Sequence, residues 1–302
     1  MSINTIAIAG ATGFIGRALV RHFAGTGYRV IAIARDRRRA QQLLGSTVSV
    51  AGWNELTSVV RQADVVINLS GAGIADQRWT KRRKAQLWDS RIEPTKQIVH
   101  ALATSGVAPR LLLNASAIGY YGNRGDEILT EESSAGSGFL AELCVEWERT
   151  ARQAESICRV VRMRFGVVLG SDGGMLKKLR PLVSTIGAVI PGTGGQWLSW
   201  IALQDVVRVV EWLCVHDSIS GAINIVAPTP VTMAEFMHTL ARQWRRRVWF
   251  HIPEFGLWAA LGEMATTITD SIRALPARLQ QEGFVFSLPS LEEAIAYNRM
   301  SS

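Results

Sequence analysis

The chain has 302 residues, of which 48% are hydrophobic and 19% charged, and its formal net charge is +8. This length and composition indicate a globular protein with one large domain and a smaller lobe, and no apolar run is long enough to span a membrane. The positive charge comes without a recognition-helix, zinc-finger or RNA-binding signature, so we expect neither nucleic acid nor a membrane as a partner.

Apolar runs alternate with helical patterns in the order of a parallel sheet that is covered on both faces. The predicted strands are Ile3–Ala9, Arg29–Ala34, Thr47–Ala51, Val65–Leu69, Leu111–Ser116, Arg159–Val168 and Ala222–Val226. The predicted helices are Gly13–Ala24, Asp36–Leu44, Glu55–Arg61, Lys81–Leu102, Leu140–Glu155, Met175–Ile186, Leu203–Val215 and Met233–Trp244.

These elements predict an α/β fold with a Rossmann-like, doubly wound parallel sheet and a smaller, mainly helical C-terminal lobe. We place the sheet domain at residues 1–226, with residues 171–200 contributing to the substrate cleft, and the substrate-side domain at residues 227–302. The boundary follows the loss of βαβ repetition near residue 170 and the Gly/Pro-rich passage at residues 191–195.

A glycine-rich turn connects the first predicted strand to the first predicted helix. Its glycines allow a sharp turn, close approach of a ligand and tight helix packing, while the helix N-terminus points free N–H groups at a pyrophosphate. The strand–turn–helix context makes this a dinucleotide-binding motif rather than a purely structural turn. The residues of the motif are Gly10, Ala11, Thr12, Gly13, Phe14, Ile15 and Gly16.

The end of the second predicted strand favours NADP(H) over NAD(H). A carboxylate at this position would bind the ribose hydroxyls of NAD, but this strand ends in Ala34 and Arg35. An arginine can bind a 2′-phosphate with paired donors and a permanent charge. Asp36 follows, and we interpret it as the N-cap of the next helix.

Small residues follow the fourth predicted strand, at the sheet edge where ligands of open α/β proteins lie. Asn68 is followed by Leu69, Ser70 and Gly71. They permit close contact with the adenosine half of a dinucleotide, although a plain tight turn explains any one of them equally well.

Together with the glycine turn, motifs along nearly the whole chain resemble the extended short-chain dehydrogenase/reductase superfamily of NAD-dependent epimerase/dehydratase type. The resemblance is closest to the atypical branch called "epimerase family protein", which has a small additional C-terminal domain. The matching stretches are Asn68–Gly71, Arg78–Trp79, Ser90–Arg91, Gly119–Gly122, Cys144–Glu148, Arg164–Leu169, Trp200–Ile201, Ala227–Val231, Arg273–Pro276 and Glu282–Phe284.

The resemblance implies an NADP(H) site at matching positions. Beyond the glycine turn, the expected cofactor contacts are Ala34, Arg35, Leu69, Ser70, Gly71, Gln86, Arg91, Ser116 and Val168. Arg91 also lies on the long helix that follows the cofactor-lining turn, where its positive charge could contact the cofactor. The alternative is that Arg91 forms a surface ion pair that contributes little to stability.

The resemblance also implies a catalytic Ser, Tyr and Lys, and only the Ser is present, as Ser116. Counted from Glu148, the Tyr position holds Leu140 and the Lys position holds Cys144, and a shift by one residue gives Phe139 and Leu143. This segment is an apolar helical face. Tyr120 and Tyr121 are the substitute proton donors closest to Ser116 in sequence, although tyrosines in such loops are more often packing residues. Cys144 has no adjacent histidine or cation that would make it a nucleophile.

Two hypotheses about function remain open. The chain is either an NADP(H)-dependent epimerase or carbonyl reductase for a small molecule, with or without a linked nucleotide, or a non-catalytic NADP(H) sensor. The sequence is compatible with a monomer or a homodimer. Trp197 and Trp200 either stack on a substrate ring or belong to the core, and Asp205 is predicted to cap the helix that follows it.

The positions of the cysteines and histidines indicate the cellular compartment and whether a metal site is expected. Cys144, Cys158 and Cys214 are scattered and lack CxxC spacing, which is typical of reduced, mostly buried thiols. No secretion signal precedes the first predicted strand, so we expect a cytoplasmic protein. The five histidines show no metal-ligand spacing, and we expect no metal site.

Overall fold

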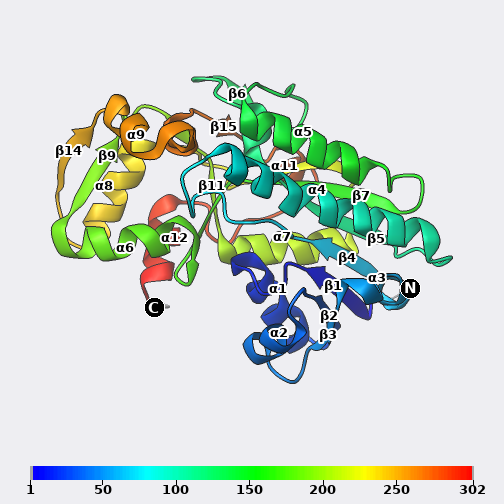
Figure 1. Cartoon of the computed structure of the whole chain (residues 1–302). Helices are drawn as coiled ribbons and strands as arrows, with labels where there is room; N and C mark the ends of the chain where they lie inside the picture. Colours follow the sequence, from blue (N-terminus) through cyan, green and yellow to red (C-terminus); the bar gives the residue numbers. More distant parts are fainter. Residues whose placement is uncertain (1–2, 301–302) are drawn as a thin grey trace.

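The computed structural model describes residues 3–300 and has a seven-stranded parallel sheet at its centre (Figure 1). The strand order is β12-β7-β5-β4-β1-β2-β3, so the order reverses between β1 and β4. Dinucleotides bind at such a switch point in doubly wound folds. The strands are β1 (Thr5–Ala9), β2 (Arg29–Ile33), β3 (Ser49–Ala51), β4 (Val65–Asn68), β5 (Leu111–Ala117), β7 (Arg159–Phe165) and β12 (Gly221–Ile225).

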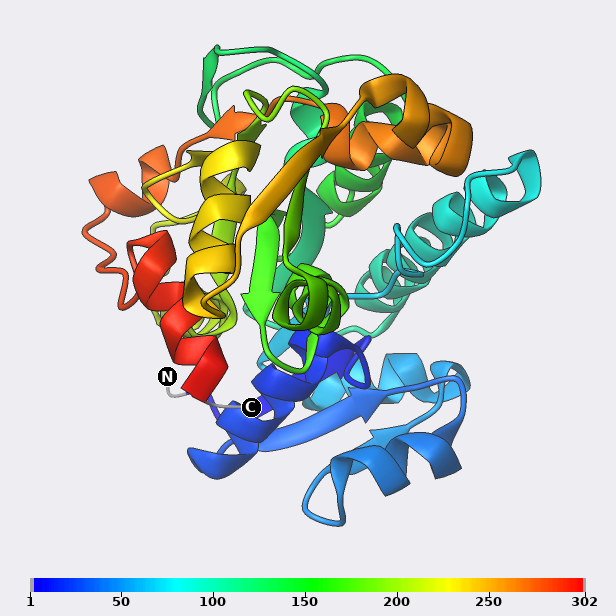
Figure 2. The same ribbon diagram turned by 90° about the vertical axis from the view of Figure 1, so that its left-hand side faces the viewer.

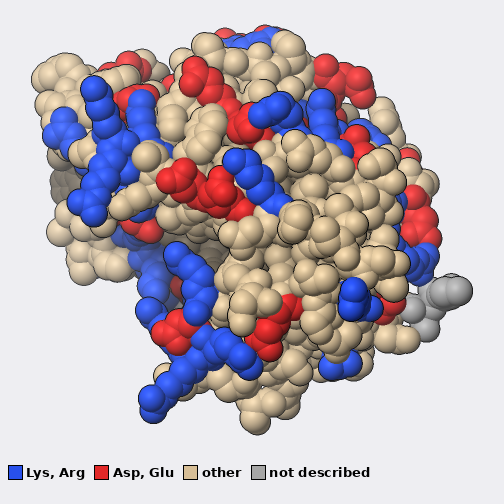
Figure 3. Space-filling view, turned by 45° about the vertical axis from the view of Figure 1, so that its right-hand side comes forward, with Lys and Arg blue, Asp and Glu red and all other residues tan. Residues whose placement is uncertain are grey.

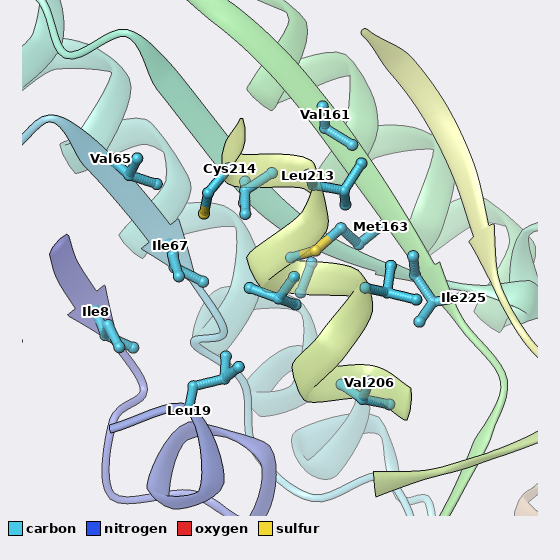
Figure 4. Packing of buried hydrophobic residues seen from close by; sticks show 14 of the residues in the cluster. Ile8, Leu19, Val65, Ile67, Val161, Met163, Val206, Leu213, Cys214 and Ile225 are labelled. Atoms are coloured by element: carbon cyan, nitrogen blue, oxygen red, sulfur yellow. The ribbon is translucent and has the colours of Figure 1, made fainter. Parts of the chain in front are cut away.

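Helices cover both faces of this sheet. They are α1 (Phe14–Gly25), α2 (Arg37–Leu44), η1 (Trp53–Glu55), α3 (Leu56–Gln62), α4 (Lys81–Thr104), η2 (Ile118–Tyr121), α5 (Phe139–Arg152) and α7 (Leu203–Val215). Successive residues of a strand point to opposite faces. In β1, Ile6 and Ile8 therefore join the core formed with α1 and α7, whereas Ala7 and Ala9 join the core formed with α3 and α4. Figure 4 shows the first of these cores around α7.

The smaller lobe draws on two separate parts of the chain. Its elements are α6 (Gly174–Ile186), β9 (Ala188–Pro191), α8 (Met233–Gln243), β14 (Val248–Ile252), α9 (Glu254–Leu261), η3 (Gly262–Ala265), α10 (Thr266–Thr269) and α12 (Leu291–Met300). Trp200 and Phe236 are among the fully buried side chains of its core. The helix α11 (Ala277–Gln281) returns to the main domain, where Leu279 packs in the large core. A domain boundary at residue 227 stays a prediction.

Four short strand pairs join the two parts of the molecule or complete the lobe. They are β8 (Val167–Gly170) with β11 (Trp200–Ala202), β9 with β14, β10 (Trp197–Leu198) with β13 (Val231–Thr232), and β6 (Ile128–Leu129) with β15 (Arg273–Ala274). Sequence patterns did not predict these pairs, because a strand of two to five residues is too short for an alternation of apolar and polar residues to be detected.

The predicted α/β architecture is confirmed, and each predicted strand and helix has a counterpart within a few residues. One prediction, a continuous strand over residues 159–168, is wrong. The chain bends at Gly166, where an added Cβ would lie 2.7 Å from the Ser199 carbonyl oxygen, and β8 pairs with β11 outside the central sheet. Within residues 3–300, no helix is long and apolar enough to cross a bilayer, and a cytoplasmic location stays a prediction.

Asp205 does not cap α7, contrary to the sequence prediction. The helix begins at Leu203, and Asp205 lies in its first turn with a fully buried carboxylate. This carboxylate accepts hydrogen bonds from Ser287 N at 2.8 Å, Ser287 Oγ at 2.6 Å and Leu288 N at 3.0 Å. Asp205 therefore fastens the C-terminal segment to the main domain.

We expect Asp205→Ala to lower the free energy of unfolding by about 2 kcal/mol, because it leaves the partly buried N–H groups of Ser287 and Leu288 without their acceptor. Urea unfolding followed by circular dichroism measures the change. Asp172→Ala, at an exposed acid, is the matched control. Equal stabilities for the two variants would contradict the fastening role.

Candidate cofactor and substrate cleft

The glycine turn between β1 and α1 has the geometry that the sequence predicts. Gly10 has a φ of +77°, and a Cβ there would lie 2.6 Å from the Leu69 carbonyl oxygen. A Cβ on Gly16 would lie 2.2 Å from the Gly10 carbonyl oxygen. Any larger residue at these two positions would separate α1 from the sheet edge. The N-cap of α1 is Gly13, which provides no side-chain cap, and the first turn holds no acid, so its N–H groups are free for an anion.

A cavity of about 680 Å³ lies in front of this turn. The surface of the molecule is hollowed on one face, with Lys, Arg, Asp and Glu side chains along the edge of the hollow (Figure 3). The cavity is lined on the sheet side by Gly10, Gly13, Phe14, Ile15, Gly16, Leu69, Gly71, Arg91 and Ser116. On the other side it is lined by Trp197, Leu198, Ser199, Glu263, Thr266, Thr267, Asp270 and Ile272. Its volume is within the range of small-molecule and cofactor sites.

Several predicted cofactor residues lie near the turn but do not line the cavity. They are Ala11, Thr12, Ala34, Arg35, Ser70, Gln86 and Val168. Arg35 is exposed just beyond β2, and no described residue forms an ion pair with it. Asp36 caps α2 as predicted, because its carboxylate accepts a hydrogen bond from Arg39 N at 2.9 Å. Gln86 is exposed and lies 3.4 Å from Arg83.

A buried hydrogen-bond network positions the turn after β4. The Asn68 amide donates to Asn114 Oδ1 at 2.7 Å and to Thr95 Oγ1 at 2.9 Å, and its oxygen accepts from Ser70 N at 3.1 Å. Trp147 Nε1 donates to the same Thr95 oxygen at 3.0 Å. This network holds Leu69 and Gly71 at the cavity wall beside the glycine turn.

Arg91 is held at the cavity wall by backbone carbonyls rather than by an acid. Its guanidinium donates to Ala72 O at 2.9 Å and to Leu87 O at 3.0 Å, and it lies 5.3 Å from the Trp147 ring centre. Burial lowers the pKa of Arg91 to about 10, so the side chain stays charged at neutral pH. A buried cation without a carboxylate partner is suited to bind an anionic ligand.

Ser116 lines the cavity, and its hydroxyl proton is already engaged. Ser116 Oγ donates to Glu148 Oε1 at 2.8 Å, and both side chains are buried. Arg164 donates to the same carboxylate through Nε at 2.7 Å and Nη2 at 3.0 Å. In this arrangement Ser116 can accept a hydrogen bond from a ligand, but it has no free proton to polarise a carbonyl oxygen.

Sequence reasoning did not identify this Glu148–Arg164 pair as part of the site. The sequence did contain a signal for a buried ion pair. Arg164 lies in β7 between apolar neighbours, and Glu148 lies on α5, one face of which is apolar. Charges within apolar segments need partners. The sequence alone did not show that the two charges meet each other and Ser116.

Tyr121 and Tyr120 do not line the cavity. The Tyr121 hydroxyl accepts a hydrogen bond from Arg164 at 3.0 Å and lies 2.7 Å from Asn224 Oδ1 and 2.9 Å from the Thr130 carbonyl oxygen. Burial raises the pKa of Tyr121 to about 12, which makes its proton harder to release. The Tyr120 ring lies against the Arg164 guanidinium, 3.5 Å from its carbon. Both rings pack around Arg164 instead of facing a substrate.

The apolar face of α5 takes the place of the missing Tyr and Lys, as the sequence predicts. Phe139, Leu140 and Cys144 line the cavity. A Cβ on Gly119 would lie 3.3 Å from Leu140 Cβ, so η2 packs directly on this face. Cys144 is fully buried, and burial raises the pKa of its thiol to about 11. A neutral thiol of this kind is a packing group, not a nucleophile.

Asp270 brings a carboxylate to the lobe side of the cavity, and the sequence patterns did not reveal it. It follows α10 directly and is partly buried. No described side chain or N–H group forms a hydrogen bond or ion pair with its carboxylate. Burial raises the pKa of Asp270 above its ordinary value. Glu263, the other acid at this wall, is paired with Lys84.

Among the other predicted residues, Trp197 lines the cavity and Trp200 is fully buried in the core of the lobe. Trp197 donates a hydrogen bond to Asp126 at 2.8 Å, and Arg273 stacks on its ring at 4.0 Å. In the part of the chain that the structure describes, no group of three His, Cys, Asp or Glu side chains is placed to hold a metal ion.

The arrangement of a glycine turn, a switch point and a lobe that closes the cleft matches known proteins. Residues 6–225 match the NAD dependent epimerase/dehydratase family, and residues 252–297 match a domain of unknown function, DUF1731. The chain belongs to the NAD-dependent epimerase/dehydratase family. It is 40% identical to "Epimerase family protein Mb2239" of Mycobacterium bovis over 305 residues, covering 98% of both chains.

Solved structures share the whole fold. The structure of human epimerase family protein SDR39U1 with NADPH superposes with a TM-score of 0.91 at 26% identity and covers 99% of this chain and 100% of that one. A nucleoside-diphosphate sugar epimerase from Corynebacterium glutamicum has a TM-score of 0.78 at 33% identity, and the match covers 98% of this chain and 58% of that one. These likenesses agree with the family assignment, and the human relative was solved with NADPH.

The raised pKa of Tyr121 has a consequence for stability at high pH. Because the folded state holds the phenol proton more tightly than the unfolded state, the protein loses stability as the pH rises from about 10 to about 12. We expect this loss to be about 2–3 kcal/mol smaller in Tyr121→Phe. Unfolding in urea across this pH range measures it.

Tyr120→Phe provides the control for this measurement. It removes a neighbouring phenol that does not share the buried contacts with Asn224 and Thr130. If both variants followed the wild-type pH dependence, the Tyr121 phenol would be exposed to solvent in solution.

Proposed function

We propose that the chain binds NADP(H) in this cleft and reduces a carbonyl group of a small, largely apolar molecule. The observation that carries the proposal is the continuous cavity, which has a glycine turn and Arg91 at one wall and an unpartnered Asp270 carboxylate at the other. The first wall suits the anionic dinucleotide, and the second suits a substrate with a polar group.

Two observations support NADP(H) over NAD(H). Arg35 is exposed at the end of β2 without an ion-pair partner among residues 3–300, and the carboxylate of the adjacent Asp36 is engaged as a helix cap. A guanidinium here attracts a 2′-phosphate, and the ribose hydroxyls of NAD lack a free carboxylate to bind them. The human relative was solved with NADPH.

The substrate half of the cavity supports a small apolar molecule rather than a nucleotide-linked sugar. Trp79, Phe139, Leu140 and Trp197 contribute apolar surface to the cavity. Its described lining includes no Lys or Arg from residues 197–300. Lys84 pairs with Glu263, but no described cation pairs with Asp270, so a diphosphate on this side would meet an uncompensated carboxylate. Repulsion between like charges disfavours that ligand.

The glycine turn and Arg91 would hold NADPH, which would provide a hydride for a carbonyl carbon, and the carbonyl oxygen would then need a proton. Ser116 has no free proton to give, since it donates to Glu148, and Tyr121 is held away from the cavity. Asp270 lines the cavity, and burial raises its pKa, so that its protonated form is more available than that of an exposed aspartate. We assign it as the proton donor, and solvent returns its proton after each turnover.

The Arg35→Ala variant tests the cofactor assignment. We expect its affinity for NADPH to fall by about tenfold or more and its affinity for NADH to change little, because the lost contact involves only the 2′-phosphate. Titration calorimetry measures both. Arg29→Ala, at the opposite end of β2, is the matched control, and equal losses for the two nucleotides would refute the role of Arg35.

The Asp270→Asn variant tests the reaction. With apolar aldehydes and ketones as probes, we expect it to lower kcat for NADPH oxidation by about 10²–10⁴-fold while NADPH affinity stays unchanged. Wild-type activity should fall as the pH rises through the pKa of Asp270, because the acid form is the donor. Asp172→Asn is the exposed control. A wild-type kcat in Asp270→Asn would exclude Asp270 as the donor.

The second candidate function is a non-catalytic NADP(H) sensor. It is favoured by the apolar Leu140 and Cys144 at the positions of the usual Tyr and Lys, and by the engaged hydroxyl of Ser116. If the wild-type protein binds NADPH tightly and oxidises it with none of the carbonyl probes, the sensor becomes the better description.

A further inference from the structure

Large apolar side chains are exposed together on the outer side of the smaller lobe. Their exposed fractions are 56% for Leu182, 67% for Ile186, 64% for Trp249, 61% for Phe250, 77% for Phe255 and 44% for Trp258. They belong to α6, β14 and α9, which lie on the same side of the molecule in Figure 2. Trp249 Nε1 donates a hydrogen bond to the Ile186 carbonyl at 2.6 Å, so β14 and the end of α6 are in contact.

Apart from Glu254 at its first position, the helix α9 has only apolar residues, and yet it lies at the surface. Its sequence is EFGLWAAL, and Leu257 is its one buried residue. A helix that is apolar on all sides is normally enclosed by protein or lipid. Exposed apolar groups gathered on one face mark a contact surface more often than chance exposure does.

Arginines lie at one end of the same surface, where the chain enters β14. Arg245, Arg246 and Arg247 directly precede β14, are exposed, and form no ion pair with a residue between 3 and 300. Arg246 Nε donates to the Ser184 carbonyl at 2.9 Å, which holds its guanidinium beside the end of α6. The acid nearest in sequence on this surface is Glu254, so cations are in excess. We call this combination of α6 end, Arg245–Arg247, β14 and α9 the aromatic–arginine face.

We propose that the aromatic–arginine face docks the protein on a membrane surface that contains anionic lipid. Tryptophan and phenylalanine rings enter the boundary between headgroups and acyl chains, and arginines contact the lipid phosphates. A second copy of the chain is the less suitable occupant, because a symmetric contact would bring six arginines into one interface, with Glu254 of each copy as the acid on this surface to offset them. The proposal replaces the sequence-based expectation of no membrane partner.

The docking face adjoins the cleft along the chain. The helix α9 continues directly into η3 and α10, which supply Glu263, Thr266 and Thr267 to the cavity wall. Contact with a bilayer would therefore hold the lobe side of the cavity near lipid. The inference stands independently of the reaction proposed above, since it depends on surface residues alone.

Sedimentation with lipid vesicles tests the proposal on the full-length protein. We expect binding to vesicles of phosphatidylcholine mixed with phosphatidylglycerol, little binding to pure phosphatidylcholine, and weaker binding as NaCl is raised. Absence of the wild-type protein from both vesicle pellets, or equal binding to the two compositions, would overturn it.

Two variants locate the contact. We expect Phe255→Ser/Trp258→Ser and Arg245→Gln/Arg247→Gln each to reduce vesicle affinity by about tenfold or more. The matched controls are Val107→Ser/Val285→Ser, at exposed apolar residues elsewhere, and Lys81→Gln/Arg82→Gln on α4. Unchanged circular dichroism and NADPH affinity show that a variant is folded.

Unchanged vesicle binding by both face variants would refute the location. Light scattering after gel filtration tests whether a second copy of the chain covers the face instead. A wild-type dimer that Phe255→Ser/Trp258→Ser converts to a monomer would assign the face to a second copy and overturn the membrane proposal.

Discussion

The buried ion pair between Glu148 and Arg164 is the interaction on which the geometry of the cleft depends. Both side chains are removed from water, so the cost of their desolvation is offset only while their hydrogen bonds are made. Glu148 belongs to α5 and Arg164 to β7, and the pair also engages Ser116 on β5 and Tyr121 on η2. Four elements around the cavity are thereby fixed by one set of contacts.

This pair also decides which chemistry is open to the site. In a hydride-transferring relative, the serine hydroxyl and a tyrosine would face the substrate. Here the serine proton points to Glu148, the Tyr121 hydroxyl is in contact with Arg164 and Asn224, and α5 presents apolar groups to the cavity. The polar groups that remain for a substrate include Asn123 and Ser137 of the main domain and Asp270 of the lobe. The lobe therefore contributes polar groups to the cavity as well as covering it.

The two walls of the cleft have different electrostatic character for different reasons. The sheet wall owes its preference for anions to backbone N–H groups at the start of α1 and to the buried Arg91 cation. The lobe wall carries Asp270 and Glu263, and among residues 3–300 only Glu263 has a cationic partner. On its outer side the same lobe is apolar and basic. One small lobe thus contributes to the cavity with one face and offers a different surface with the other.

The order of strands and helices, the glycine turn and the capping role of Asp36 were all predictable from the sequence. They depend on local properties: the two-residue and 3.6-residue apolar periods, the freedom of glycine at φ above zero, and the short reach of an aspartate side chain to the N–H groups of the next helix turn. The apolar face that replaces the Tyr and Lys was equally visible, because it is a single helix with a regular period.

Only the tertiary structure decided which polar groups face the cavity. Glu148 meets Arg164 across 16 residues, Tyr121 meets Asn224 across 103, and Asp205 meets Ser287 across 82. Contacts over such separations depend on the packing of whole elements, and no local pattern encodes them. For the same reason the sequence suggested Tyr120 and Tyr121 as donors by their nearness to Ser116, whereas the fold turns both toward Arg164 and brings Asp270 to the cavity from the far end of the chain.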